Sequence, residues 1–157
     1  MKLLSFLIFV FICLGSAGLG AFFTNFSVKT WYKTIKKPAW NPPDKVFAPV
    51  WTTLFLMMAV AGWMVWERLP ENGDYGPIIL FGIQLILNVA WSGLFFTLRR
   101  PDLALMEIIL LWFMILWTTV SFWSVYWIAG MLFVPYFLWV SFAIILNFTI
   151  WKLNRQE

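Results

Sequence analysis

The chain has 157 residues, of which 62% are hydrophobic, 21% aromatic and only 11% charged. A soluble domain is about half apolar and about one quarter charged, so this composition excludes a soluble globular protein. The formal net charge is +4, but the charges lie between apolar segments, which argues against a nucleic-acid-binding face. Histidine is absent and cysteine occurs once, at Cys13, so we expect neither an intrachain disulfide nor a metal site built from His and Cys.

Long apolar runs predict five membrane-spanning helices, because one span needs about 20 mostly apolar residues. The last run, from Leu103 to Trp151, is too long for one span across a hydrocarbon core of about 30 Å. We divide it near Trp123–Trp127, where polar and aromatic residues suit the membrane surface. The expected fold is a single all-α integral membrane bundle over residues 1–157, with spans at about 3–23, 47–66, 75–98, 103–123 and 128–151.

Basic residues divide unequally between the two ends of this bundle. The end with the N-terminus has Lys2 and Arg68, and the opposite end has Lys29, Lys33, Lys36, Lys37, Lys45, Arg99, Arg100, Lys152 and Arg155. The positive-inside rule therefore predicts that the N-terminus is outside and the C-terminus cytoplasmic. Because the N-terminus does not resemble an organellar transit sequence and helical spans are not typical of a bacterial outer membrane, we expect a prokaryotic cell membrane.

The first apolar run has an alternative interpretation as a cleavable signal peptide. Lys2, the apolar stretch and Ser16-Ala17-Gly18 resemble such a peptide. Cleavage would translocate the lysine-rich segment that follows, against the charge rule, so we favour a retained helix. Small residues four apart on it, Ser16 with Gly20 and Ala17 with Ala21, allow close helix packing, either within the monomer or between two copies.

The loop at 24–46 differs in composition from the rest of the chain. It contains Pro38, Pro42 and Pro43, which prevent a regular helix, and five of the basic residues. Trp31, Tyr32 and Trp40 give the loop an apolar side. We expect this loop to fold back over the helix ends as a lid.

Polar side chains within the spans are candidate functional groups, because they are costly inside a membrane. Gln84, Asn88 and Ser92 follow each other at four-residue spacing, and with Trp91 they share one helix face. That face could form interhelical hydrogen bonds, line a pocket, or do both.

Glu107 is the only carboxylate within an apolar run. It lies about 7.5 Å along the helix from Asp102, so we expect it to be hydrated or paired with Arg99 or Arg100. This position is too shallow for the deep ionisable group that a proton-coupled exporter needs.

Tryptophan is the most unusual residue type, with 12 in the chain. We assign six to the membrane surface or to lipid contact: Trp63, Trp66, Trp112, Trp117, Trp123 and Trp127. Trp51, Trp91 and Trp139 instead lie within spans near a proline or a polar residue, and Ala143 leaves room beside Trp139 on the same face as Leu146. These residues predict a cavity with aromatic walls for a flat, apolar molecule.

The basic loop at the mouth of such a cavity could meet carboxylates on the ligand. A porphyrin has both a flat body and propionate groups, and the absence of histidine favours a metal-free ring over ligated haem. We expect no required cofactor.

The order of motifs resembles the translocator protein family, also known as tryptophan-rich sensory proteins and peripheral benzodiazepine receptors. The loop reads Trp31-Tyr32 and then Lys37-Pro38-Ala39-Trp40-Asn41-Pro42-Pro43, followed by Pro49-Val50-Trp51-Thr52. Further motifs are Gln84-Leu85, Leu87-Asn88, Trp91, Phe95-Phe96, Pro135-Tyr136, Trp139, Phe142-Ala143 and Leu146-Asn147. The resemblance covers the chain from Trp31 onward.

The resemblance implies a five-helix bundle, usually a homodimer, that binds porphyrins such as protoporphyrin IX and synthetic benzodiazepine-type ligands. The implied pocket consists of Trp51, Asn88, Trp91, Trp139, Ala143 and Leu146 under the lid of the first loop, which carries Trp31, Tyr32 and Trp40. Phe148 stands where the family's sterol consensus has tyrosine, which argues against cholesterol as a ligand.

Two other functions remain open. Some relatives are credited with light-dependent porphyrin degradation, for which Trp51 and Trp139 would be the electron donors, although no general acid, nucleophile or metal site is recognisable. The other alternative is a small exporter of hydrophobic compounds, which depends on Glu107.

Overall fold

The computed structural model describes residues 2–155, and all its regular elements in that range are helices. Five stretches are long and apolar enough to cross a membrane: α1 (Lys2–Thr24), α3 (Asp44–Trp66), α4 (Gly76–Ser92) with its extension η1 (Gly93–Thr97), α5 (Pro101–Val125) and α6 (Trp127–Asn154). A short helix, α2 (Trp31–Thr34), lies in the loop after α1. The five-helix membrane bundle is thus confirmed, with helix ends within three residues of the expected spans.

Prolines mark the starts of three spans. Pro43 precedes α3, and Pro77 and Pro101 occupy the first turn of α4 and α5, where their missing amide hydrogen leaves no helical bond unmade. Asp44 in the first turn of α3 also suits the positive end of the helix dipole, so this helix begins three residues earlier than expected. The turn between α5 and α6 is a single extended residue, Tyr126, inside the segment where the sequence predicted it.

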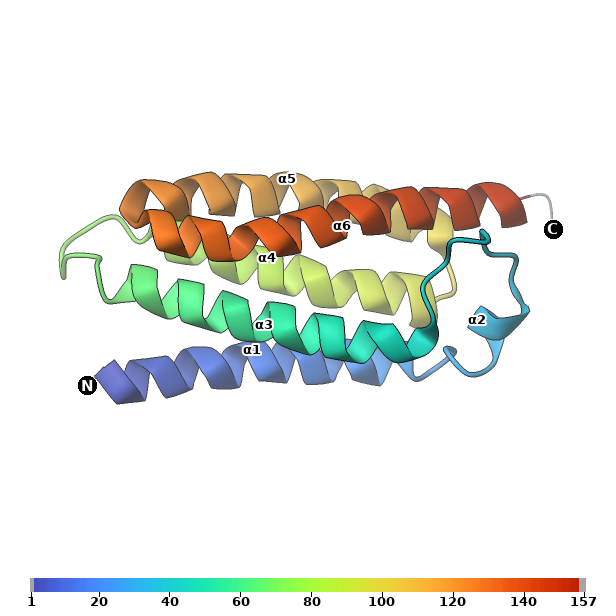
Figure 1. Cartoon of the computed structure of the whole chain (residues 1–157), viewed down its shortest axis with the longest axis horizontal. Coiled ribbons are helices and arrows are strands. Elements are labelled where there is room, and N and C mark those ends of the chain that lie inside the picture. Colours follow the sequence, from blue (N-terminus) through green and yellow to red (C-terminus); the bar gives the residue numbers. More distant parts are fainter. Residues whose placement is uncertain (1, 156–157) are drawn as a thin grey trace.

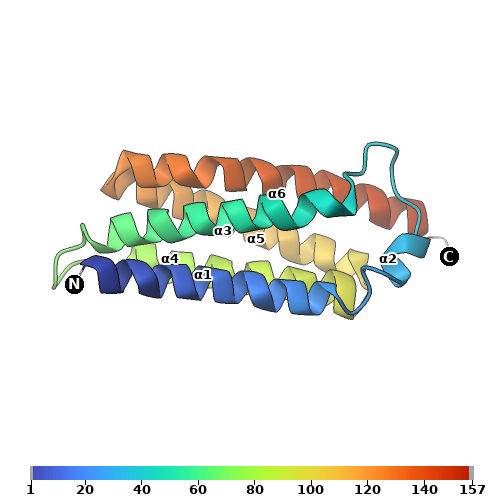
Figure 2. The same ribbon diagram turned by 60° about the horizontal axis from the view of Figure 1, so that its bottom comes forward.

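The helices form an elongated bundle with the two termini at opposite ends (Figure 1). α5 packs mainly against α6 and α4, while α1 packs against α3 and α4. Phe81, Phe122 and Phe133 form an aromatic core between α4, α5 and α6, with ring centroids 5.0 to 6.2 Å apart. Toward the end that carries α2, α1 and α3 diverge (Figure 2).

α1 and α3 approach closely near the N-terminus because Gly62 has no side chain. A Cβ atom on Gly62 would lie 2.9 Å from the ring of Phe9 and 3.1 Å from Phe81. Phe9 therefore packs against the backbone of α3 and joins α1 to the core.

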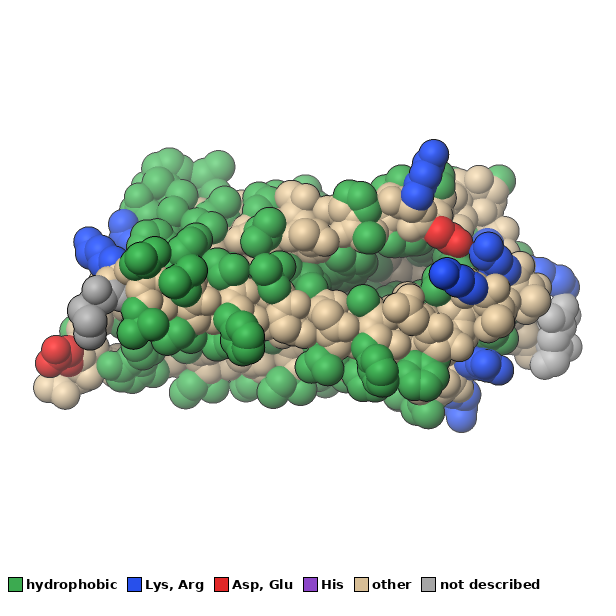
Figure 3. Space-filling view, turned by 90° about the horizontal axis from the view of Figure 1, so that it is seen from below, with side chains coloured by type: hydrophobic (Ala, Val, Ile, Leu, Met, Phe, Trp, Pro, Cys, Tyr) green, Lys and Arg blue, Asp and Glu red, His purple; other side chains and the backbone are tan. Residues whose placement is uncertain are grey.

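Charged side chains gather at the two ends of the bundle, and apolar side chains cover the middle (Figure 3). Most Lys and Arg side chains lie at the end that carries α2 and the C-terminus, as the five-span topology requires. Which side of the membrane this end faces stays a prediction from the charge rule.

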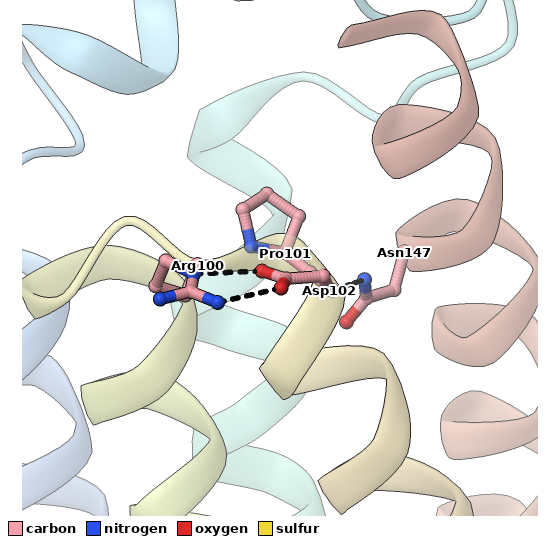
Figure 4. Close-up of polar contacts among 4 residues, drawn as sticks. All are labelled: Arg100, Pro101, Asp102 and Asn147. Carbon is pink, nitrogen blue, oxygen red and sulfur yellow. Dashed lines mark hydrogen bonds and ion pairs between the residues drawn. The ribbon is translucent and has the colours of Figure 1, made fainter. Parts of the chain in front are cut away.

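The connection from η1 to α5 is fixed by polar contacts (Figure 4). Arg99 turns the chain with a φ of 54°, and Arg100 then forms a bidentate pair with Asp102, with N–O distances of 2.9 and 2.7 Å. Glu107 pairs with neither arginine, so that expectation was wrong. Within residues 2–155, both of its carboxyl oxygens are buried and have no hydrogen-bond partner.

The surface assignment of the tryptophans is correct for four of six. Trp66, Trp117, Trp123 and Trp127 are exposed on the bundle, where lipid would contact them. Trp63 and Trp112 instead pack half-buried against the core, and the Trp112 indole donates a hydrogen bond of 2.7 Å to Ser141. For these two residues the surface assignment was wrong.

Candidate ligand cavity

A cavity of about 520 Å³ occupies the half of the bundle where α1 and α3 diverge. Its walls come from α1, α3, α4 with η1, and α6, and the α2 loop contributes residues at one end. This volume is within the usual range of about 300 to 1,000 Å³ for small-molecule sites. Seven residues predicted from the sequence line it: Tyr32, Trp51, Asn88, Trp91, Trp139, Ala143 and Leu146.

Two predicted residues, Trp31 and Trp40, are not among the lining residues. Trp31 packs its ring edge against Phe95, with centroids 5.8 Å apart, and Trp40 contacts Phe142 at the same separation. Because Phe95 and Phe142 do line the cavity, both tryptophans lie directly behind its wall and connect the loop to it.

The aromatic wall centres on Trp51 of α3 and Trp139 of α6. Their ring centroids are 6.4 Å apart, with the planes at 87°, which is the edge-to-face arrangement that aromatic rings favour. On α4, Trp91 stacks on Phe95 at 5.0 Å. These four rings line the cavity in differing orientations, a surface suited to a flat apolar molecule.

Asn88 gives the cavity a polar contact that is tied to the core. Its amide nitrogen donates to the Tyr136 hydroxyl at 2.7 Å, and that hydroxyl donates to the Gln84 carbonyl oxygen, also at 2.7 Å. Tyr136 and Gln84 are fully buried, so their polar groups serve α4–α6 hydrogen bonding. Of the two roles left open for this face, Gln84 therefore has the packing role, whereas Asn88 both packs and lines the cavity.

Asn147 fixes the orientation of the Trp91 indole. Its side-chain oxygen accepts a hydrogen bond of 2.9 Å from the Trp91 ring nitrogen, and its amide nitrogen donates to the backbone oxygen of Pro101 at 2.9 Å (Figure 4). One side chain thus joins α4, α6 and the start of α5. Neither Asn147 nor Tyr136 was predicted to belong to the site, although both are polar residues within the last apolar run.

The wall on α1 was also not predicted as part of the site. Ala17, Gly20, Ala21 and Thr24 face the cavity at helical spacing, and a Cβ on Gly20 would meet only the Ser92 hydroxyl at 3.6 Å. Three of the four small residues that we expected at a packing surface thus line the cavity, and Ala17 also packs against the core, whereas contact between two copies stays a prediction. The sequence signal was present, but small residues beside a cavity and small residues at a tight interface have the same spacing.

Tyr32 anchors the α2 loop inside the bundle. It is buried against Phe95 and Phe96, and its hydroxyl donates to the Asn41 side-chain oxygen at 3.3 Å. Burial raises the pKa of Tyr32, so the hydroxyl stays neutral. The Lys37 ammonium donates to the Tyr32 carbonyl oxygen at 2.6 Å and lies 4.7 Å from the centre of its ring.

A second contact holds the loop to the end of α6. The Asn154 side chain accepts a hydrogen bond from the Lys36 amide and donates one to the Lys36 carbonyl oxygen, both at 2.9 Å. A side-chain amide paired with both backbone groups of one residue fixes the position of the loop strongly. The loop is therefore held against the end of α6, and its action as a lid stays a prediction.

The mouth of the cavity carries charge. Lys29, Lys33 and Asp44 line it and are exposed, and the space-filling view shows a hollow near this end (Figure 3). Ala21 and Thr52, also exposed lining residues, place part of the opening between α1 and α3. Within residues 2–155, no three His, Cys, Asp or Glu side chains gather where they could hold a metal ion. The arrangement can bind a flat apolar body with an anionic group at its edge.

Comparison with known proteins agrees with this architecture. Residues 8–152 match the TspO/MBR family. The chain is 42% identical to tryptophan-rich protein TspO of Chlorobaculum tepidum, over 98% of each chain. It is 36% identical to protein CrtK of Rhodobacter capsulatus, over 100% of this chain and 97% of that one. It is also 34% identical to the human translocator protein, over 87% of this chain and 82% of that one. With five membrane-spanning helices and a match over most of its length, this chain belongs to the TspO/MBR family.

Proposed function

We propose that this protein is a membrane receptor or transporter that binds a porphyrin, such as protoporphyrin IX, and regulates tetrapyrrole handling in a prokaryotic cell. Benzodiazepine-type hydrophobic molecules would occupy the same cavity. The observation that carries the proposal is the combination of the Trp51–Trp139 wall with the exposed Lys29 and Lys33 at the mouth.

The two parts of the cavity match the two parts of the proposed ligand. A porphyrin ring buries its apolar faces against indole rings, and its propionates meet the lysine ammonium groups at the aqueous end. The side-chain amide of Asn88, which lines the cavity, can form a hydrogen bond with a ring nitrogen or a carbonyl group of the ligand.

Relatives' names support a role in sensing or translocation. A protein of Cereibacter sphaeroides with 34% identity over 95% of this chain is named tryptophan-rich sensory protein, and the human relative is named translocator protein. Family resemblance also implies a homodimer, which cross-linking of the purified protein in lipid nanodiscs would detect.

The test is a titration of protein in nanodiscs with protoporphyrin IX, read from quenching of tryptophan fluorescence. Trp51→Phe and Trp139→Phe should each weaken binding by about tenfold, because each removes part of an aromatic wall. Trp117→Phe is the control, since Trp117 is 62% exposed on the outer surface of α5. Equal affinity in all three variants would exclude this cavity as the site.

The Trp51–Trp139 pair also favours a second candidate function, light-dependent degradation of the bound porphyrin. An excited ring held against two indoles could take an electron from one of them. Illumination of the complex would then give a new absorbing product in wild type but not in the two phenylalanine variants. An unchanged porphyrin spectrum after illumination would leave binding as the function.

A further inference from the structure

Glu107 of α5 has an unusual environment for a carboxyl group in a membrane span. Its side-chain oxygens are both buried, and no donor among residues 2–155 lies within hydrogen-bonding distance of either. An ionised carboxylate without donors is very unfavourable in an apolar interior, and such groups take up a proton instead. Neither the cavity lining nor the helix contacts described above use this side chain.

No neighbouring element supplies a positive charge for Glu107. α4 and η1, which pack against α5, contain no titratable residue. α6 contains Tyr136, whose hydroxyl lies within electrostatic range of Glu107 and of the buried Cys13 thiol of α1, and it contains Lys152 at its exposed end. The ionisable residues of α3, which packs weakly on α5, are Asp44 and Lys45 in its exposed first turn.

The charged groups at the start of α5 do not compensate a negative charge on Glu107 either. Arg100 is held by Asp102 in a bidentate pair (Figure 4), and Arg99 is exposed in the preceding turn. Among residues 2–155, the carboxyl oxygens of Glu107 are therefore buried without a hydrogen-bond donor or a paired cation.

We propose that Glu107 is an intramembrane proton-binding site, neutral when the protein is folded as described, and that its protonation controls affinity in the cavity through Tyr136. The reaction is simple proton exchange, in which the carboxylate takes a proton from water and returns it. The second half of the proposal rests on the proposed ligand-binding function, whereas the first does not.

The link to the cavity is the hydrogen-bonded chain through Tyr136. Its hydroxyl accepts from Asn88, which lines the cavity, and donates to Gln84. A negative charge on Glu107 favours turning the single hydroxyl proton away from Gln84, which leaves the Gln84 carbonyl oxygen without its donor and reorients the lone pairs that accept from Asn88. Loss of the proton from Glu107 should therefore disturb the cavity, and affinity should fall as pH rises.

The proton site is tested by infrared spectroscopy of the protein in nanodiscs from mildly acidic to alkaline pH. Wild type should show the carbonyl stretch of a protonated carboxylic acid at neutral pH, shifted in heavy water and absent from Glu107→Gln. Asp102→Asn is the matched control on the same helix and should keep the band, because Asp102 is ionised against Arg100. Absence of the band from wild type, or its presence in Glu107→Gln, would overturn the proposal.

Coupling is tested with protoporphyrin IX dimethyl ester, whose blocked propionates do not titrate. Wild-type affinity should fall at least about threefold as the infrared band disappears with rising pH, whereas Glu107→Gln should keep the low-pH affinity throughout. Tyr136→Phe should keep the band and lose the pH dependence of affinity. The same pH dependence in wild type and Glu107→Gln would disprove the coupling. Failure of the ester to bind at any pH would count against the proposed function while the infrared result still decides the proton site.

Discussion

The indole rings of Trp51 and Trp139 meet edge to face, with their centroids 6.4 Å apart and their planes at 87°. They belong to α3 and α6, two helices far apart in the sequence, and each ring is further fixed by its neighbours. Trp51 contacts Tyr136 at 6.3 Å, and Trp139 contacts Phe142 at 5.5 Å. The aromatic wall is therefore preorganised before any ligand arrives, which lowers the entropic cost of binding.

The size of the cavity depends on the absence of a side chain at Gly20. Gly20→Leu should reduce protoporphyrin IX affinity by about tenfold or more, because the new side chain would extend from a wall that now meets only Ser92. Gly18→Leu is the control, since a Cβ there meets nothing within 4 Å and Gly18 does not line the cavity. Fluorescence titration measures both. Equal affinities in the two variants would contradict the position assigned to α1.

Two other helix glycines differ in their surroundings, because a Cβ on Gly62 would meet Phe9 whereas a Cβ on Gly82 would meet nothing within 4 Å. Gly62→Ala should destabilise the protein by about 1 to 2 kcal/mol, because its methyl group would overlap Phe9 by more than the improved helix propensity offsets. Gly82→Ala should stabilise it by about 0.5 to 1 kcal/mol, since a Cβ there meets nothing within 4 Å. Unfolding by dodecyl sulfate in mixed micelles gives both values. A Gly62→Ala protein as stable as wild type would show that α1 does not pack as described.

The contact between Asn154 and Lys36 should control how quickly a ligand leaves. Asn154→Ala removes both hydrogen bonds to the Lys36 backbone, each worth about 0.5 to 1.5 kcal/mol, so the dissociation rate should rise about tenfold. Hydrogen exchange of the loop amides should rise in the same variant. Asn72→Ala, in the exposed loop at the other end of the bundle, should change neither quantity. If dissociation is unaffected by Asn154→Ala, the loop does not act as a lid.

Charge at the mouth should affect only ligands that carry carboxylates. Replacing Lys29 and Lys33 together by Gln should weaken protoporphyrin IX binding a few-fold, because exposed ion pairs are worth about 0.2 to 1 kcal/mol each. The effect should shrink at high salt and disappear with the dimethyl ester. Lys152→Gln, at the exposed end of α6 and outside the cavity, is the control. Equal losses for the acid and the ester would show that the lysines act on the lid and not on the ligand.

The helices were predictable because run length alone defines a membrane span. Even the turn at Tyr126 could be located, since the apolar stretch around it has the length of about two membrane spans. The start of α3 was less predictable, because the favourable contact between Asp44 and the helix dipole extends the helix beyond its apolar part.

The site was only partly predictable from the sequence. Trp51, Trp91 and Trp139 could be selected because each lies within a span near a proline or a polar residue. Asn147, which lines the cavity, and Tyr136, which supports Asn88 from behind, were missed, since a polar side chain in a span acquires its role from a partner on another helix. Glu107 was misassigned for a related reason. Its distance along the helix from Asp102 could be calculated, but the pairing of Arg100 with Asp102 and the burial of both Glu107 oxygens depend on contacts that the spacing does not give.

The contact of Phe9 with Gly62 has a mechanical consequence for the bundle. α1 and α3 are in close contact at that point and diverge toward the end that carries α2 (Figure 2), so the distance between their axes increases along the bundle. A small rotation about such a pivot changes the width of the far end much more than that of the near end. We therefore expect a slight change in the angle between these two helices to alter the width of the cavity without repacking the aromatic core.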